Sequence, residues 1–157
     1  MAGSNVPPET PLIRASIRQT PSASYGSSEA LAQAFGRVIL EPAWWPADAA
    51  EISYSLDGDA TRTHYRIASR RNDGSPIFLT GFPEVDWAGR SPKEWLEGEW
   101  SEPLELAHLR GLIGWVGTPP ALHAVVYDEH LAIQLIGYST EAEVMNALAS
   151  LRRVAPN

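Results

Sequence analysis

The chain has 157 residues, of which 44% are hydrophobic, and carries a formal net charge of −7 with a pI near 5.0. This length and composition predict one domain with a substantial core, and the negative charge argues against broad binding to nucleic acids or to anionic membrane surfaces. Because the chain contains no cysteine, disulfides, thiolate metal sites and a cysteine nucleophile are excluded.

The first 27 residues form a segment rich in proline, serine, threonine and alanine. This composition disfavours a packed core. We therefore expect residues 1–27 to be a disordered or loosely docked arm, and residues 28–157 to form a single α+β domain. The apolar residues Leu12, Ile13 and Ile17 leave open that part of the arm lies along a sheet edge.

The sequence contains no membrane-spanning stretch. No segment approaches the roughly 18 to 20 consecutive apolar residues that cross a bilayer, and the opening residues Met-Ala-Gly-Ser do not begin a secretory signal. We therefore expect a cytoplasmic location by default, and an extracytoplasmic one if a leader or anchor has been removed.

A short helix and a strand open the predicted domain. Ser28 has a side chain that caps helices, and Gly36 suits the left-handed residue that ends one, so a helix is expected over residues 29–35. The next expected element is a strand over residues 37–40. It stops before Pro42, which has no amide hydrogen for a sheet ladder.

Alternating apolar and polar residues predict a hairpin in the middle of the chain, with strands over residues 51–56 and 61–67. In the expected register Leu56 pairs with Thr61. A further strand is expected over residues 76–81, after a turn.

Residues 82–103 interrupt this pattern. A capping box with proline at the first helical position predicts a short helix over residues 92–97. Strand character returns over residues 104–116, with a bulge or break expected near Gly111 and Gly114.

The last third of the chain predicts a second hairpin followed by a helix. Placing Val126 opposite Leu131 puts the large apolar residues of both strands on one face. Thr140 is the expected N-cap of the helix and Glu143 completes a capping box. The last turn is expected to contain Arg152 and Arg153. Its apolar stripe consists of Val144, Ala147, Leu148 and Leu151.

These elements predict an α+β fold. The expected architecture is an antiparallel sheet of about six or seven strands, with the C-terminal helix and the short N-terminal helix packed on one face. An exposed edge of such a sheet can pair with a second copy, so both a monomer and a homodimer are compatible with the sequence.

The six tryptophans are the least ordinary feature of the composition. Indoles in loops either line a binding pocket or close the edge of a small core, and the core interpretation is favoured. If they bind a ligand, the candidate residues are Trp87, Trp95, Trp100, Trp44 and Trp45.

A weaker candidate is an anion site on one strand. Arg62, His64 and Arg66 share a face of the strand and can bind an anionic group. A solvated polar face is the favoured interpretation of the same pattern.

Catalytic and metal motifs give little support for an enzyme. Nucleophile-elbow, zinc-protease and phosphate-loop patterns are absent. The acidic, tryptophan-rich connection over residues 82–105, together with a strand histidine such as His64 or His108, is the alternative enzymatic site. Asp128 and its two neighbours are metal-competent but diverge in a turn. No catalytic residue, metal or cofactor is therefore expected.

Several segments resemble an uncharacterised bacterial domain family found in anti-sigma-like and lipoprotein-sorting-like proteins. The similar segments are the proline-bounded stretch 42–46, the turn 126–131, the stretch 137–141 and the helix end 148–151, and the resemblance covers about residues 37–154. The chain departs from the family in having no anchor or signal, and in having His130 where a turn glycine is usual. The resemblance implies no catalytic residues.

We therefore expect a non-enzymatic binding or protein-interaction module. Its partner would be a protein segment or an apolar small molecule, held by the open sheet face or by the tryptophan-bearing connection. Nucleic acid is not an expected partner.

Overall fold

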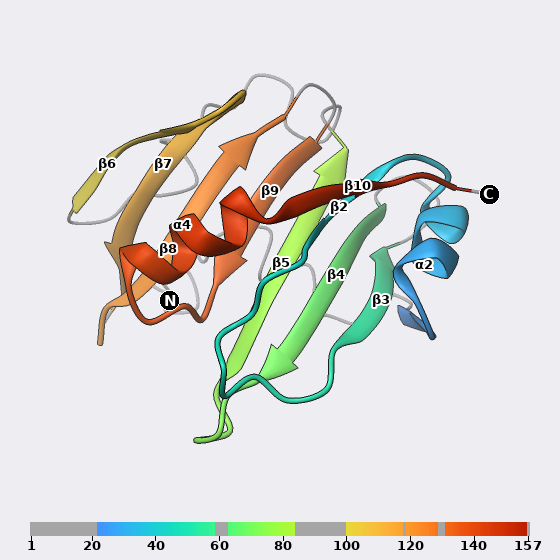
Figure 1. The fold of residues 1–157 in the computed structure, drawn as a ribbon, viewed down its shortest axis with the longest axis horizontal. Coiled ribbons are helices and arrows are strands. Elements are labelled where there is room, and N and C mark those ends of the chain that lie inside the picture. The colour runs from blue at the N-terminus through green and yellow to red at the C-terminus, as the bar shows by residue number, and fades with distance from the viewer. Residues whose placement is uncertain (1–21, 59–62, 84–99, 118, 129–130, 157) are drawn as a thin grey trace, which may run out of the picture.

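The computed structural model describes residues 22–58, 63–83, 100–117, 119–128 and 131–156. Within these ranges, eight strands form one antiparallel sheet in the order β1-β3-β4-β5-β9-β8-β7-β6 (Figure 1). The strands of this main sheet are β1 (Ser22–Tyr25), β3 (Ser53–Gly58), β4 (Thr63–Arg70), β5 (Pro76–Pro83), β6 (Trp100–Leu106), β7 (Leu109–Val116), β8 (Ala121–Tyr127) and β9 (Leu131–Ile136).

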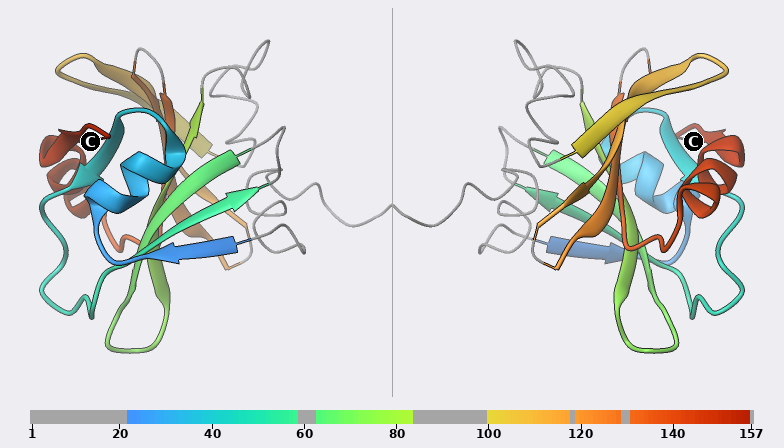
Figure 2. Two further views of the ribbon diagram at one scale, coloured as in Figure 1. Left: turned by 90° about the vertical axis from the view of Figure 1, so that its right-hand side faces the viewer. Right: turned by 90° about the vertical axis from the view of Figure 1, so that its left-hand side faces the viewer.

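A second layer covers one face of the main sheet. It consists of helix α2 (Ser28–Phe35), helix α4 (Glu141–Ala149) and a two-stranded sheet of β2 (Ile39–Pro42) and β10 (Leu151–Val154). Figure 2 shows both helices on the same side of the main sheet. The covered face is called the inner face below, and the opposite one the outer face.

The main core lies between the inner face and this layer. Leu31 of α2, Ile133 of β9 and Val144 of α4 are fully buried in it. The hydroxyl of buried Tyr65 donates to the Leu40 carbonyl oxygen at 2.8 Å and accepts from the Leu40 amide at 2.9 Å. This side chain therefore ties the main sheet to the small one.

The outer face carries a smaller apolar cluster. Phe82, Val125 and Ala132 are buried there, from three adjacent strands, β5, β8 and β9. The main sheet thus has buried side chains on both faces.

The predicted α+β class and antiparallel sheet are confirmed. The main sheet has more strands than the expected six or seven, because a further strand pairs at each of its two edges. Residues 22–25 of the predicted arm form β1 against β3. Residues 100–106 form β6 against β7.

Both predicted hairpin registers are wrong by an even number of residues. Leu56 pairs with Tyr65 and not with Thr61, because β3 continues through Asp57, which pairs with His64. Val126 pairs with Ile133 and not with Leu131. Because side chains alternate with a period of two, even shifts leave every residue on its predicted face.

The C-terminal helix begins as predicted and ends earlier. The Thr140 hydroxyl accepts from the Glu143 amide at 3.1 Å, which confirms the N-cap. The helix stops at Ala149. Arg152 and Arg153 lie in β10, where they pair with Glu41 and Leu40 of β2, so their expected place in the last helical turn is wrong.

Gly111 lies inside a continuous strand, so the expected break there is wrong. A Cβ at this position would collide with the Val125 carbonyl oxygen, so glycine permits a close approach of β7 and β8. The chain reverses at Ala107 and His108 instead, with Ala107 at a φ of 54°.

The N-terminal helix α2 is confirmed, although its N-cap is Ser27 and not Ser28. The strand expected over residues 37–40 lies slightly later, at β2. Among the described residues, no helix is long and apolar enough to cross a membrane. The helix expected over residues 92–97 lies outside the described residues.

Candidate functional site

An apolar pocket of about 270 Å³ lies on the inner side of the main sheet, at the turn between β6 and β7. Its walls come from that turn, the end of α4, β10 and β2. The lining residues are Leu40, Leu106, Ala107, His108, Leu109, Leu148, Ala149, Leu151 and Arg153. Five of them, three leucines, one alanine and one arginine, are far apart in sequence from the turn and are brought to it by the covering layer.

The junction between α4 and β10 shapes one wall of the pocket. Ser150 ends the helix, and its hydroxyl donates to the Ala147 carbonyl oxygen at 2.8 Å. The Ser150 hydroxyl oxygen also accepts from the amides of Ala43 and Trp44, at 3.1 and 3.0 Å. Ser150 therefore fixes the direction in which the chain leaves α4, with Leu151 at the pocket.

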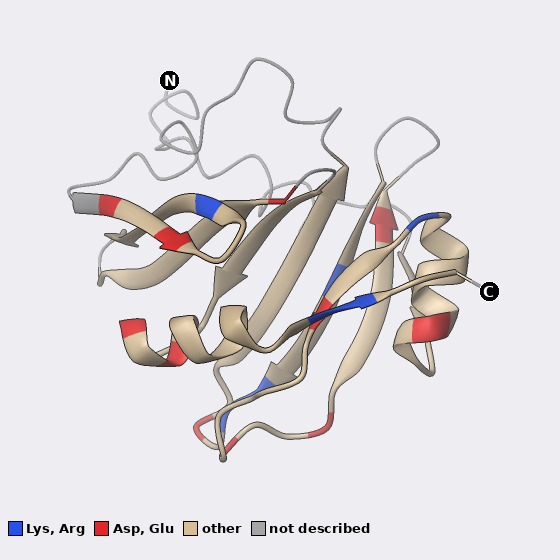
Figure 3. Ribbon diagram, turned by 45° about the horizontal axis from the view of Figure 1, so that its top comes forward, with Lys and Arg blue, Asp and Glu red and all other residues tan. Residues whose placement is uncertain are grey.

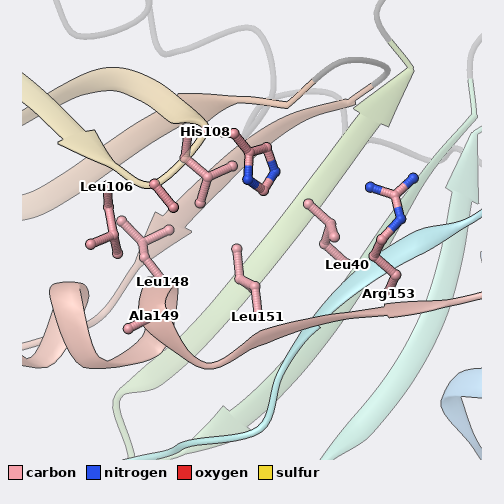
Figure 4. Close-up of a pocket in the computed structure, with 9 residues that line it drawn as sticks. Leu40, Leu106, His108, Leu148, Ala149, Leu151 and Arg153 are labelled. Carbon is pink, nitrogen blue, oxygen red and sulfur yellow. The ribbon is translucent and has the colours of Figure 1, made fainter.

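One side of the pocket is polar. In Figure 4, His108 and Arg153 lie on the same side, while Leu106, Leu148, Leu151 and Leu40 line the remainder. The carboxylate of Asp128 lies 3.2 Å from His108 Nε2 and 3.4 Å from Arg153 Nη1. The Asp128 side chain is only 4% exposed, whereas both partners are exposed. A buried carboxylate thus positions two nitrogen-bearing side chains at the rim.

The arrangement suits an apolar group with a polar end. The leucine side chains offer nonpolar contact, and His108 and Arg153 offer nitrogen donors at one side. None of the lining residues that the structure describes carries a hydroxyl or thiol, so this part of the wall offers no serine, threonine or cysteine nucleophile.

The structure does not bring the predicted tryptophans into this pocket. Trp44 and Trp45 are partly buried against the main core, as the core interpretation predicts for such residues. The backbone of Trp100 lies in β6, opposite Trp115 of β7, and its side chain is outside the described part. Trp87 and Trp95 are also outside it, so a tryptophan site stays a prediction.

The predicted anion residues lie elsewhere, on the outer face. His64 and Arg66 project from β4, and Arg62 is outside the described ranges. The favoured interpretation of a solvated face is wrong at His64, which is 4% exposed. Burial holds the pKa of His64 below its usual value, although the nearby Asp57 carboxylate, 3.8 Å away, acts in the opposite direction.

The sequence offers His108 as a candidate histidine but does not predict the pocket, because no local pattern connects its residues. His108, Asp128 and Arg153 come from three separate segments that only the tertiary fold joins. Asp128 was considered only with its turn neighbours as a metal ligand. Among the described residues, no group of three or more histidine or acidic side chains is placed to hold a metal.

Comparison of the chain with protein-family models, curated proteins and solved structures found no match.

Proposed function

We propose that this domain is a non-enzymatic binding module that holds a small, mainly apolar ligand in the pocket beside the β6–β7 turn. The observation that carries the proposal is the leucine-lined cavity of about 270 Å³ with His108 and Arg153 on one side. Pockets for drug-sized ligands measure roughly 300 to 1,000 Å³. The volume here favours a smaller molecule, with a polar end that accepts a hydrogen bond.

The polar rim supports orientation of such a ligand. Asp128 is buried and holds both His108 and Arg153, so these side chains lose less rotamer freedom when a ligand binds. A ligand oxygen at the rim would accept from them, while its hydrocarbon part contacts the leucines.

A pocket-filling variant tests this proposal. We expect 1-hexanol, titrated into isotopically labelled protein, to shift the methyl resonances of Leu148 and Leu151 saturably. Ala149→Leu places a larger side chain at the pocket wall and should abolish these shifts.

Ala34→Leu is the matched control, because Ala34 is an exposed alanine of the other helix. It should bind hexanol like the wild type. Loss of the shifts in both variants, or shifts that never saturate in the wild type, would contradict the proposal.

A second candidate, a hydrolase, is favoured by one observation. A carboxylate beside an imidazole can orient a general base, and Asp128 has that relation to His108 at the pocket. This candidate shares His108 with the expected enzymatic site but takes its carboxylate from Asp128 and not from the connection over residues 82–105. Residues 84–99 of that connection lie outside the described residues.

Turnover of p-nitrophenyl hexanoate separates the two functions. The binding proposal expects the wild type and His108→Gln to hydrolyse the ester at the same slow rate. If the hydrolysis rate falls in both His108→Gln and Asp128→Asn, but not in His123→Gln, the protein is an enzyme and the binding proposal is wrong.

A further inference from the structure

The outer face of the main sheet carries a row of polar side chains across its centre. Arg66 of β4 pairs with Thr80 of β5, and Thr80 pairs with Gln134 of β9. These three strands are neighbours in the middle of the sheet (Figure 1). Because paired residues of adjacent strands point to the same face, the three side chains form one continuous row.

One polar atom of each side chain in this row is buried and lacks a hydrogen-bond partner among the described residues. Thr80 is 2% exposed and Gln134 is 1% exposed. Within the part of the chain that the structure describes, Thr80 Oγ1, Gln134 Nε2 and Arg66 Nε have no hydrogen-bond partner. Buried polar atoms of this kind are rare, since each loses its contacts with water and gains nothing in return.

Two histidines flank the row on the same face. His64 and His123 are buried, and their atoms Nε2 and Nδ1 likewise find no hydrogen-bond partner among the described residues. Burial lowers the pKa of both histidines. Both are therefore neutral near pH 7 and add polar atoms without adding positive charge.

The charge of the row comes from Arg66. Its guanidinium lies over the Phe78 ring, 4.6 Å from the ring centroid. Asp57 is the nearby acid on this face, and it lies beside His64 in the adjacent row. Burial lowers the pKa of Arg66, whereas Asp57 acts in the opposite direction. Among the described residues Arg66 takes part in no ion pair, so its charge has no direct counterion there.

Apolar residues lie at the end of the row and beside it. Val125 of β8 pairs with Gln134 at the end of the row, and Phe82 and Ala132 pair with each other in the adjacent row, on the side of His64. All three are buried on the outer face. A ligand at this place would thus meet hydrogen-bond donors at one end and hydrocarbon at the other.

We propose that the outer face binds an organic carboxylate. Its two oxygen atoms accept hydrogen bonds from Arg66, Thr80 and Gln134, and its apolar part lies on Phe82, Val125 and Ala132. A singly charged carboxylate balances one guanidinium, whereas a phosphate dianion would bring excess charge into an apolar surrounding. This site is separate from the inner pocket, because the two lie on opposite faces of the main sheet.

The first test uses benzoate as the probe and benzamide and inorganic phosphate as comparisons. We expect benzoate to shift the side-chain nitrogen resonances of Gln134 and Arg66 Nε saturably, and benzamide to bind at least roughly tenfold more weakly. Tighter binding of phosphate than of benzoate, or equal binding of benzamide, would overturn the assignment of a carboxylate site.

Arginine variants distinguish a specific contact from general attraction. Arg66→Gln should weaken benzoate binding at least roughly tenfold, because a charged hydrogen bond is lost. Arg70→Gln makes the same charge change on the same face of β4, at an exposed position, and should leave benzoate binding unchanged. Equal weakening by both variants would overturn the proposal.

The variant Thr80→Val provides a readout that does not depend on ligand. It removes an unpartnered buried hydroxyl and keeps the side-chain shape, so the melting temperature without benzoate should rise while benzoate binding is lost. A lower melting temperature would show that Thr80 has a structural partner such as a fixed water, and would overturn its role as a ligand donor. Hexanol binding at the inner pocket should remain in this variant. A failure of the carboxylate proposal can therefore be told apart from a failure of the proposed function.

Discussion

Two buried tyrosines show how differently one side chain is used within the same core. The Tyr65 hydroxyl both donates to and accepts from the backbone of Leu40. The Tyr138 hydroxyl is buried and has no hydrogen-bond partner among the described residues. The phenol ring of each contributes apolar contact, but only Tyr65 satisfies polar groups of another segment.

Removing the two hydroxyl groups should therefore have unequal effects on stability. Tyr65→Phe leaves the amide and carbonyl of Leu40 without their partner and is expected to lower the free energy of unfolding by about 1–3 kcal/mol. Tyr138→Phe, the matched control, should change it by about 0.5 kcal/mol or less. Urea unfolding of both variants checks this, and equal losses would show that Tyr138 also has a partner.

The elements of the covering layer depend on contacts made at their ends. Ser150 joins the last turn of α4 to the segment that follows β2, through the amides of Ala43 and Trp44. Beside it, Arg152 donates from Nε to the buried Glu41 carboxylate at 2.8 Å, and Figure 3 shows basic β10 lying along acidic β2. The position of β10, and with it the pocket wall, follows from these contacts.

Ser150→Ala should loosen this junction. The Trp44 amide loses its acceptor, whereas the Ala43 amide keeps the Ser150 carbonyl oxygen at 3.2 Å. We therefore expect a loss of about 0.5–1.5 kcal/mol in the free energy of unfolding. Hexanol should also bind more weakly, because Leu151 is less well positioned. Ser24→Ala, at an exposed position of β1, is expected to change neither quantity. A normal hexanol affinity in a destabilised Ser150→Ala variant would show that this junction does not position the pocket wall.

Local patterns predicted the faces of the strands, the C-cap of α2 and the N-cap of α4, because these depend on residues close in sequence. Thr140 with Glu143 and Gly36 at the end of α2 are examples. The early end of α4 was not predictable in the same way, since β10 forms against a strand that is distant in sequence. Arg152 and its partner Glu41 are separated by 111 residues.

The candidate site was accessible to sequence reasoning only in part. His64 and Arg66 were identified as polar residues on one face, which the structure confirms, but alternation does not reveal that β5 and β9 add Thr80 and Gln134 beside them. The inner pocket could not be predicted at all, because Asp128 meets Arg153 through tertiary packing.

At the scale of the whole molecule, Arg71 connects segments that belong to both layers. Its guanidinium donates to Asp48 at 2.9 and 3.1 Å and to Glu143 of α4 at 2.9 and 3.2 Å. It also donates to the Gly137 carbonyl oxygen at 3.3 Å. These hydrogen bonds hold the pKa of both carboxyl groups below their usual values.

The lowered pKa values predict a loss of stability in acid. A carboxyl group whose pKa is lower in the folded state contributes stability above its unfolded pKa, near 4, and loses it as the pH falls through the folded pKa. Arg71→Gln should therefore reduce stability at pH 7 and flatten its decline below about pH 4.5. Thermal melts between pH 7 and pH 3 measure both effects.

Arg37→Gln is the control for this experiment, because it removes the same charge from an exposed position outside the network. It should retain the acid profile of the wild type. An unchanged profile in Arg71→Gln would mean that other carboxyl groups govern acid unfolding.

The ladder between β2 and β10 also constrains when the fold can be completed. It joins residues 39–42 to residues 151–154. The covering layer therefore cannot be completed until residues 151–154 have left the ribosome. Until then the inner face of the emerging sheet, with Tyr65, Ile67 and Leu79, lacks the part of its cover that α4 and β10 provide. Contacts this distant in sequence also slow folding. A nascent chain of this protein is consequently expected to be a client of chaperones that shield apolar surface at the ribosome exit.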